Sequence, residues 1–135
     1  MTKEREALDM FGALLMKRVR DGRIGEWDVA VTGGGKSEQG LFVRELLQSF
    51  DAQQIDAIRQ LIPRIVDTAL HNLLWTLEQE EAVVIGVHTV AGFVPNLSEV
   101  SIDELCGELD EWILRLSSKH YPGPPYDGYI LPPIR

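Results

Sequence analysis

Apolar and polar residues alternate with a helical period along most of this chain. Apolar residues at three- and four-residue steps (Leu8, Phe11, Leu15, Val19) predict an amphipathic helix over residues 2–20, closed by Asp21-Gly22. A second helix is predicted over residues 38–49, with Leu41, Phe42, Leu46 and Leu47 facing inward. The longest periodic stretch follows Asp51 and runs for about eight turns to Leu77. Its apolar face is wide enough to contact neighbouring elements on two sides. We expect this helix to be the spine of the fold, with a kink or a break at Pro63.

Shorter apolar segments predict a small amount of sheet. Residues 82–88 (AVVIGVH) are β-branched and apolar, and residues 92–94 could pair back on them as a hairpin. Residues 27–31 are a possible further strand, and residues 112–116 are compatible with either helix or strand. The predicted fold is therefore α+β and mainly α: a long Pro-kinked central helix, two or three further helices and a small antiparallel β-hairpin.

The last residues differ in composition from the rest of the chain. Five of the sixteen residues from position 120 to 135 are proline, interleaved with Tyr121, Tyr126 and Tyr129. Proline at this density excludes regular helix or sheet. We expect one globular domain over residues 1–120, followed over residues 121–135 by a Pro/Tyr-rich segment that is either a packed strap or a free tail.

Charge and composition exclude several classes of protein. The 135 residues carry a net charge of −8; residues 1–67 hold 10 basic and 11 acidic side chains, and residues 68–135 hold 3 and 10. An acidic half repels phosphate backbones, so we expect no nucleic-acid partner. No apolar run approaches the roughly 20 residues of a membrane span. A single cysteine, Cys106, favours a reducing compartment, and we expect a cytoplasmic protein.

A glycine-rich loop is the most specific motif for ligand chemistry. Residues 30–37 (AVTGGGKS) match a relaxed phosphate-binding loop, in which backbone N–H groups from Gly35 and its neighbours wrap a phosphate, Lys36 reaches the outer phosphates and Ser37 holds Mg²⁺. Against this hypothesis, the chain has too few strands for a doubly wound nucleotide fold. The alternative is a glycine turn that leads into a helix capped by Ser37.

A polar stripe on the long helix is the second candidate site. Asp67 and His71, four residues apart, point the same way and could share a proton or bind a metal, although the Glu-x-x-His motif of helical metal sites is absent. The alternative is a solvated face with local Arg64–Asp67 and Asp67–His71 contacts. Trp75 belongs to the same stripe, and it is either covered by the hairpin or the C-terminal segment or part of a contact surface.

Residues 65–77 (IVDTALHNLLWTL), a following short strand and residues 105–113 (LCGELDEWI) resemble small, acidic, uncharacterised bacterial proteins over about half the chain. The resemblance implies no activity or cofactor; proteins of this kind are often immunity or antitoxin partners. With no catalytic set or metal site evident, we expect a non-enzymatic module that binds another protein through Asp67, His71, Trp75, Tyr126 and Tyr129. A phosphate-ligand or nucleotide-binding protein is the alternative, and self-association stays open.

Overall fold

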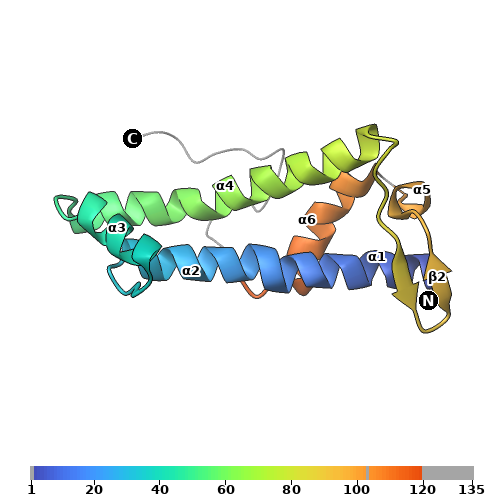
Figure 1. Ribbon diagram of the computed structural model, residues 1–135, viewed down its shortest axis with the longest axis horizontal. Helices are drawn as coiled ribbons and strands as arrows, with labels where there is room; N and C mark the ends of the chain where they lie inside the picture. The colour runs from blue at the N-terminus through green and yellow to red at the C-terminus, as the bar shows by residue number, and fades with distance from the viewer. Residues whose placement is uncertain (1, 103, 120–135) are drawn as a thin grey trace.

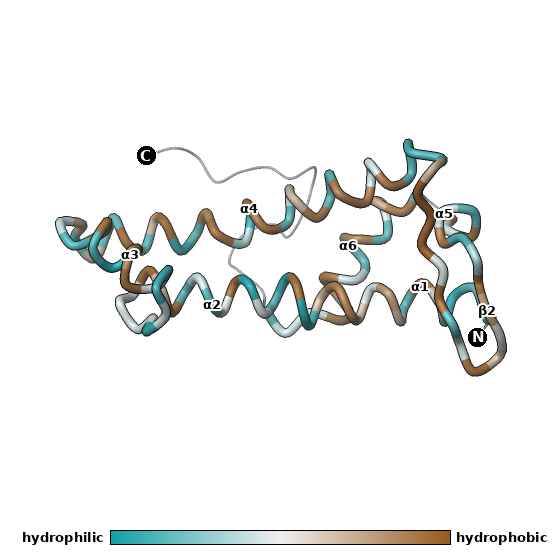
Figure 2. Tube along the Cα trace, viewed as in Figure 1, coloured by the Kyte–Doolittle hydropathy of each residue, from teal (hydrophilic) through white to brown (hydrophobic). Residues whose placement is uncertain are grey.

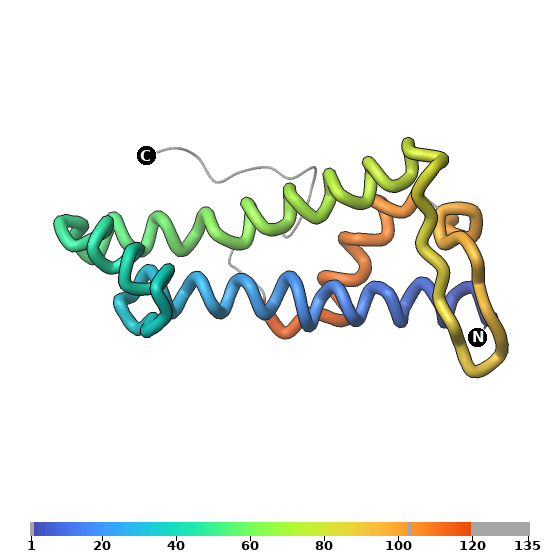
Figure 3. Tube along the Cα trace, viewed as in Figure 1, coloured from blue at the N-terminus to red at the C-terminus, as the bar shows by residue number. Residues whose placement is uncertain are grey.

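A computed structural model describes residues 2–102 and 104–119 (Figure 1). The chain begins with α1 (Lys3–Leu14), continues without interruption through the π-helix η1 (Leu15–Asp21) and ends this first rod with α2 (Gly22–Val31). The short helix α3 (Glu38–Leu46) turns the chain, and α4 (Ala52–Gln79) runs back along the rod (Figure 3). The predicted mainly helical fold with a long central helix is confirmed.

The remaining elements close one end of this helical pair. Strands β1 (Val87–Thr89) and β2 (Gly92–Val94) form an antiparallel hairpin, with Val87 opposite Val94. The one-turn helix α5 (Leu97–Val100) follows, and α6 (Glu104–Leu116) then crosses between α1 and α4 (Figure 1). Within the described residues, no helix combines the length and the apolar character needed to cross a membrane.

Three local predictions need correction, and one of two alternatives at Pro63 is settled. The first helix does not end at Asp21-Gly22, and residues 27–31 are helix rather than strand. The first strand begins at Val87, so residues 82–86 lie outside the sheet. Of the kink or break predicted at Pro63, the break does not occur, since α4 continues through this residue although a proline ring removes one backbone donor from a helix.

Asp51 caps α4 as expected, and it does so within a capping box. Its side chain accepts the backbone N–H of Gln54, and the Gln54 side chain accepts the backbone N–H of Asp51, both at 2.8 Å. Two N–H groups that would otherwise lack a partner at the start of the helix are satisfied in this way.

Trp112 is the largest side chain with no exposed surface, and it occupies the centre of the core between α1 and α6. It packs edge-on against Phe11, with ring centroids 6.0 Å apart. A Cβ atom on Gly12 would lie 2.4 Å from the indole, so a glycine is required where α1 meets this ring. A second, smaller core lies at the far end, between α2, α3 and the first half of α4.

Candidate functional site

The polar stripe predicted on α4 is not a solvated face. Asp67 has no exposed surface, and its partner is Arg20 of η1, which is equally buried. Arg20 Nε donates to Asp67 Oδ1 at 2.6 Å and Arg20 Nη2 donates to Asp67 Oδ2 at 3.2 Å. This bidentate geometry is stronger than a single hydrogen bond between an arginine and a carboxylate. The prediction that Asp67 contributes to a protein-binding surface is therefore wrong, because no partner can reach its side chain.

Arg20 also anchors the segment that follows α6. Its Nη1 donates to Ser117 Oγ at 2.7 Å and to the backbone carbonyl of Lys119. Asp21 accepts hydrogen bonds from Ser117 Oγ at 2.5 Å and from the backbone N–H of Ser118 at 2.8 Å. The cluster therefore joins three segments that are distant in the sequence: η1, the middle of α4 and residues 117–119. We assign it a structural role.

The π-helix explains why sequence periodicity missed Arg20. A π turn contains extra residues relative to an α-helix, so positions beyond it rotate away from the 3.6-residue pattern. Arg20 lies in this segment and is buried, whereas a strict α-helical reading treats it as the polar end of an amphipathic helix. The sequence offers one signal, the acidic Asp67 in the middle of the long helix, and this residue alone does not indicate Arg20 as its partner.

A second charged network joins α1 to α6. Arg5 donates to Asp9 at 2.6 Å and to both oxygens of Glu108 at 3.2 and 3.1 Å, and Arg115 donates to Asp9 at 3.0 Å. Burial alone would raise the pKa of Asp9, but the hydrogen bonds from Arg5 and Arg115 hold it below its ordinary value. This network also ties helices together and leaves no carboxylate poised for proton transfer.

The glycine-rich loop does not have the context of a phosphate-binding loop. It follows a helix, α2, instead of a strand. A Cβ atom on Gly35 would lie 2.9 Å from Gly40 Cα, so the glycines allow the chain to cross itself closely between α2 and α3. Ser37 Oγ accepts the backbone N–H of Gly40 at 3.0 Å and caps α3. Among the described residues, no lysine or arginine lines the adjoining hollow of about 290 Å³, as a phosphate site would require. The geometry therefore matches the alternative of a capped glycine turn, with Lys36 exposed beside it.

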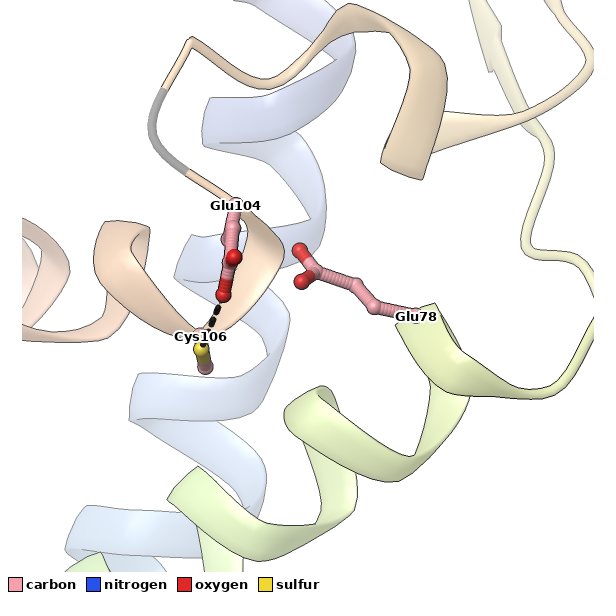
Figure 4. Close-up of side chains that lie close together, drawn as sticks. All are labelled: Glu78, Glu104 and Cys106. Carbon is pink, nitrogen blue, oxygen red and sulfur yellow. Dashed lines mark hydrogen bonds between the residues drawn. The ribbon is translucent and has the colours of Figure 1, made fainter.

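Glu78, Glu104 and Cys106 form the one group within the described residues whose side chains lie close enough to share a metal ion (Figure 4). One ligand atom from each lies within 4.8 Å of the others, and Cys106 Sγ donates to Glu104 Oε2 at 3.6 Å. The pKa of Glu78 is raised mainly by burial and to a lesser extent by the charge of Glu104. The pKa of Cys106 is raised mainly by burial and to a lesser extent by the charge of Glu78. Each raised pKa means that the folded environment disfavours the deprotonated form, which is the form that binds a cation. Burial and a raised pKa are both typical of an unreactive thiol, so we assign Cys106 no chemical role.

Trp75 lies on the outer side of α4 and is 47% exposed, so the hairpin does not cover it. His71, one turn earlier, is half-buried. Tyr126 and Tyr129, the other two predicted contact residues, lie outside the described residues. The predicted contact surface is thus divided, with Trp75 accessible and Asp67 in the interior.

Helix α3 presents a group of exposed apolar residues that sequence periodicity assigned to the core. Leu41, Phe42 and Leu46 are each more than half exposed, Phe42 the most at 64%, and Phe50 just beyond the helix is 41% exposed. The side of α3 that faces inward instead carries Gly40 and Val43.

Two carboxylates lie among these apolar residues. Glu38 and Glu45 are seven residues apart, so they project on the same outward side of α3. Within residues 2–102 and 104–119, neither has an ion-pair partner. We call this surface the α3 patch; it consists of Glu38, Leu41, Phe42, Glu45, Leu46 and Phe50.

Comparison with known proteins adds no assignment. No protein-family model, curated protein or solved structure matches this chain.

Proposed function

We propose that this chain is a non-enzymatic protein-binding module that uses the α3 patch as its contact surface. The observation that carries this proposal is the exposure of four large apolar side chains in one short segment. Contiguous apolar patches are uncommon on isolated soluble domains and mark sites of interaction. Aromatic side chains such as Phe42 and Phe50 are enriched at the centres of protein interfaces.

The charges of the patch indicate the chemistry of the partner. Glu38 and Glu45 flank Phe42 on the outward side, and the protein as a whole carries a charge of −8. A partner segment with apolar residues between lysines or arginines would bury the phenylalanines and neutralise both carboxylates. A second copy of the same patch would bring like charges together. We therefore propose a basic, amphipathic segment of another protein.

The polar clusters described above support a binding role rather than catalysis. Arg20, Asp67 and Asp21 use their charges on one another and on residues 117–119, and Arg5 and Asp9 join α1 to α6. Catalysis requires charged groups that are held ready for a substrate. Here those groups hold helices together.

Affinity capture with the tagged full-length chain at its natural level tests this proposal. Phe42→Asp should lower recovery of the basic partner about 30-fold, as expected when an interface loses roughly 2 kcal/mol at a central aromatic residue. Leu114→Asp, at an exposed leucine of α6, is the matched control and should leave recovery unchanged. Equal recovery with both variants, at unchanged thermal midpoints, would refute the α3 patch as the contact surface.

A further inference from the structure

The outer side of α4 carries no charged residue over its whole length. Ten of its exposed positions share this side at 3.6 residues per turn: Gln54, Ala57, Leu61, Ile65, Thr68, Ala69, Asn72, Trp75, Thr76 and Gln79. We call this surface the α4 outer face. Figure 2 shows apolar positions repeating along the whole of α4 instead of gathering at one end.

This distribution inverts the usual pattern of a surface helix, in which charges face the solvent. The charged residues of α4 all lie on its other sides, and two of them, Arg64 and Asp67, are buried. Meanwhile Ile65 is 62% exposed on the outer face. A face of this composition is typical of a helix that packs against another helix.

We propose that a second copy of this chain packs on the α4 outer face, with the two α4 helices antiparallel about a two-fold axis near Thr68 and Ala69. In a two-fold contact, residues close to the axis meet their own copies, so any charge there would be repelled. The α4 outer face avoids this repulsion because it has no charge. The α3 patch, with its two carboxylates, does not have this property.

The order of side chains along the face also suits a two-fold axis. Small residues, Thr68 and Ala69, lie in the middle, and larger ones lie about one and two turns away: Leu61 and Ile65 before them and Trp75 after them. Small residues at a crossing point let two helices approach closely, and the flanking large residues then pack around the crossing. An antiparallel pair about this axis therefore places Leu61 near Trp75 and Thr76 of the second copy and Ile65 near its Asn72.

The size of the face sets the expected affinity. From Gln54 to Gln79 the helix is about 39 Å long, and a single helix is roughly 10 Å wide. A contact between two such faces falls at the small end of specific interfaces. We expect a dissociation constant in the micromolar range, strengthened by salt because salt screens the repulsion between two copies of charge −8.

Sedimentation equilibrium of the full-length protein, from micromolar to millimolar concentration, tests the proposal. The predicted result is a concentration-dependent rise from 15.2 kDa to twice that mass. Ile65→Glu should abolish the rise at an unchanged thermal midpoint, and Leu114→Glu should leave it intact. A mass of 15.2 kDa at every concentration overturns the proposal.

Spin labels test the antiparallel geometry directly. Labels at Thr68→Cys, near the axis, should lie closest together. For each residue that the labelled position lies further from the axis, the separation between the two labels should grow by about 3 Å, because each of the two helices rises 1.5 Å per residue. Labels at Gln79→Cys should therefore lie much further apart. The wild-type protein, whose only thiol is the buried Cys106, controls for background labelling. Equal separations at both positions, or a dimer that Ile65→Glu does not weaken, would contradict this interface. None of these results depends on the α3 patch, so the two proposals stand or fall separately.

Discussion

Asp67 Oδ1 lies 2.6 Å from Arg20 Nε, and neither side chain has any surface in contact with solvent. Removing two charges from water is costly, and their attraction offsets that cost only while both partners are present. The pair therefore stabilises the fold conditionally, since the loss of one member leaves the other charged, buried and unpaired.

We predict that Asp67→Ala lowers the free energy of unfolding by about 3–5 kcal/mol, as expected when one partner of a buried pair is removed. The double variant Arg20→Met/Asp67→Leu should cost less than the sum of the two single variants, because neither member of the pair is left charged and buried without the other. Urea unfolding measures both. Arg59→Ala, which breaks the exposed Arg59–Asp28 pair, is the control and should cost about 1 kcal/mol or less. A loss of similar size for Asp67→Ala and Arg59→Ala would contradict this description.

Two glycines within helices should respond in opposite ways to alanine. Gly12→Ala places a methyl group 2.4 Å from Trp112, and we predict a loss of about 1–3 kcal/mol from overpacking. Gly25 lies in α2, where the nearest atom to a new Cβ is 4.0 Å away, so Gly25→Ala should stabilise the protein by about 0.5–1 kcal/mol. Thermal unfolding of the two variants provides the comparison, and stabilisation by both would show that α1 and α6 are less closely packed than described.

The glycine turn between α2 and α3 gives a prediction that separates a structural role from phosphate binding. Gly40→Ala should destabilise the protein, because its Cβ would lie 2.8 Å from the backbone of Gly35. Lys36→Ala should leave stability unchanged, and Mg²⁺-nucleotides should not shift the thermal midpoint of the wild-type protein. A nucleotide-induced shift that disappears in Lys36→Ala would restore the phosphate-binding hypothesis.

Glu78 gives a prediction about pH. Burial and the neighbouring Glu104 raise its pKa in the folded protein above the ordinary value of 4.5. Its contribution to stability is therefore complete below that ordinary value and is lost as the pH rises through the folded-state pKa. We predict that Glu78→Gln stabilises the protein more at pH 7 than at pH 4, as measured by urea unfolding. Glu81→Gln removes the same charge from an exposed site, and an equal pH dependence for both variants would contradict the assignment.

The elements of this fold could be predicted where a local sequence pattern specifies them, and not where contacts between distant residues decide the structure. The 3.6-residue period and the Asp51 cap predicted α4 closely, and the β-branched segment predicted the hairpin to within a few residues. Residues 27–31 were mistaken for a strand because β-branched residues occur in both structures, and the packing of α2 on α4 decides between them. The Arg20–Asp67 pair joins residues 47 positions apart through a π-helix that has no sequence signature.

The exposed apolar positions show a different limit. Periodicity correctly placed Leu41, Phe42 and Leu46 on one helix, and the apolar character of these residues assigned them to the interior. A helix of nine residues with apolar residues on several sides cannot bury them all against one neighbour. Which side remains exposed depends on how α3 packs against α2, and these helices meet where Gly35 and Gly40 approach closely.

Photo-crosslinking in cells tests the central claim, that the α3 patch binds another protein, most directly. A photoreactive phenylalanine analogue at position 42 should form a discrete adduct whose crosslinked peptide is basic and amphipathic, and the Glu38→Lys/Glu45→Lys background should reduce its yield. The same analogue at Glu26, an exposed position of α2, should form no such adduct. Equal labelling from positions 42 and 26, or a crosslinked peptide without lysine or arginine, would contradict the proposed function.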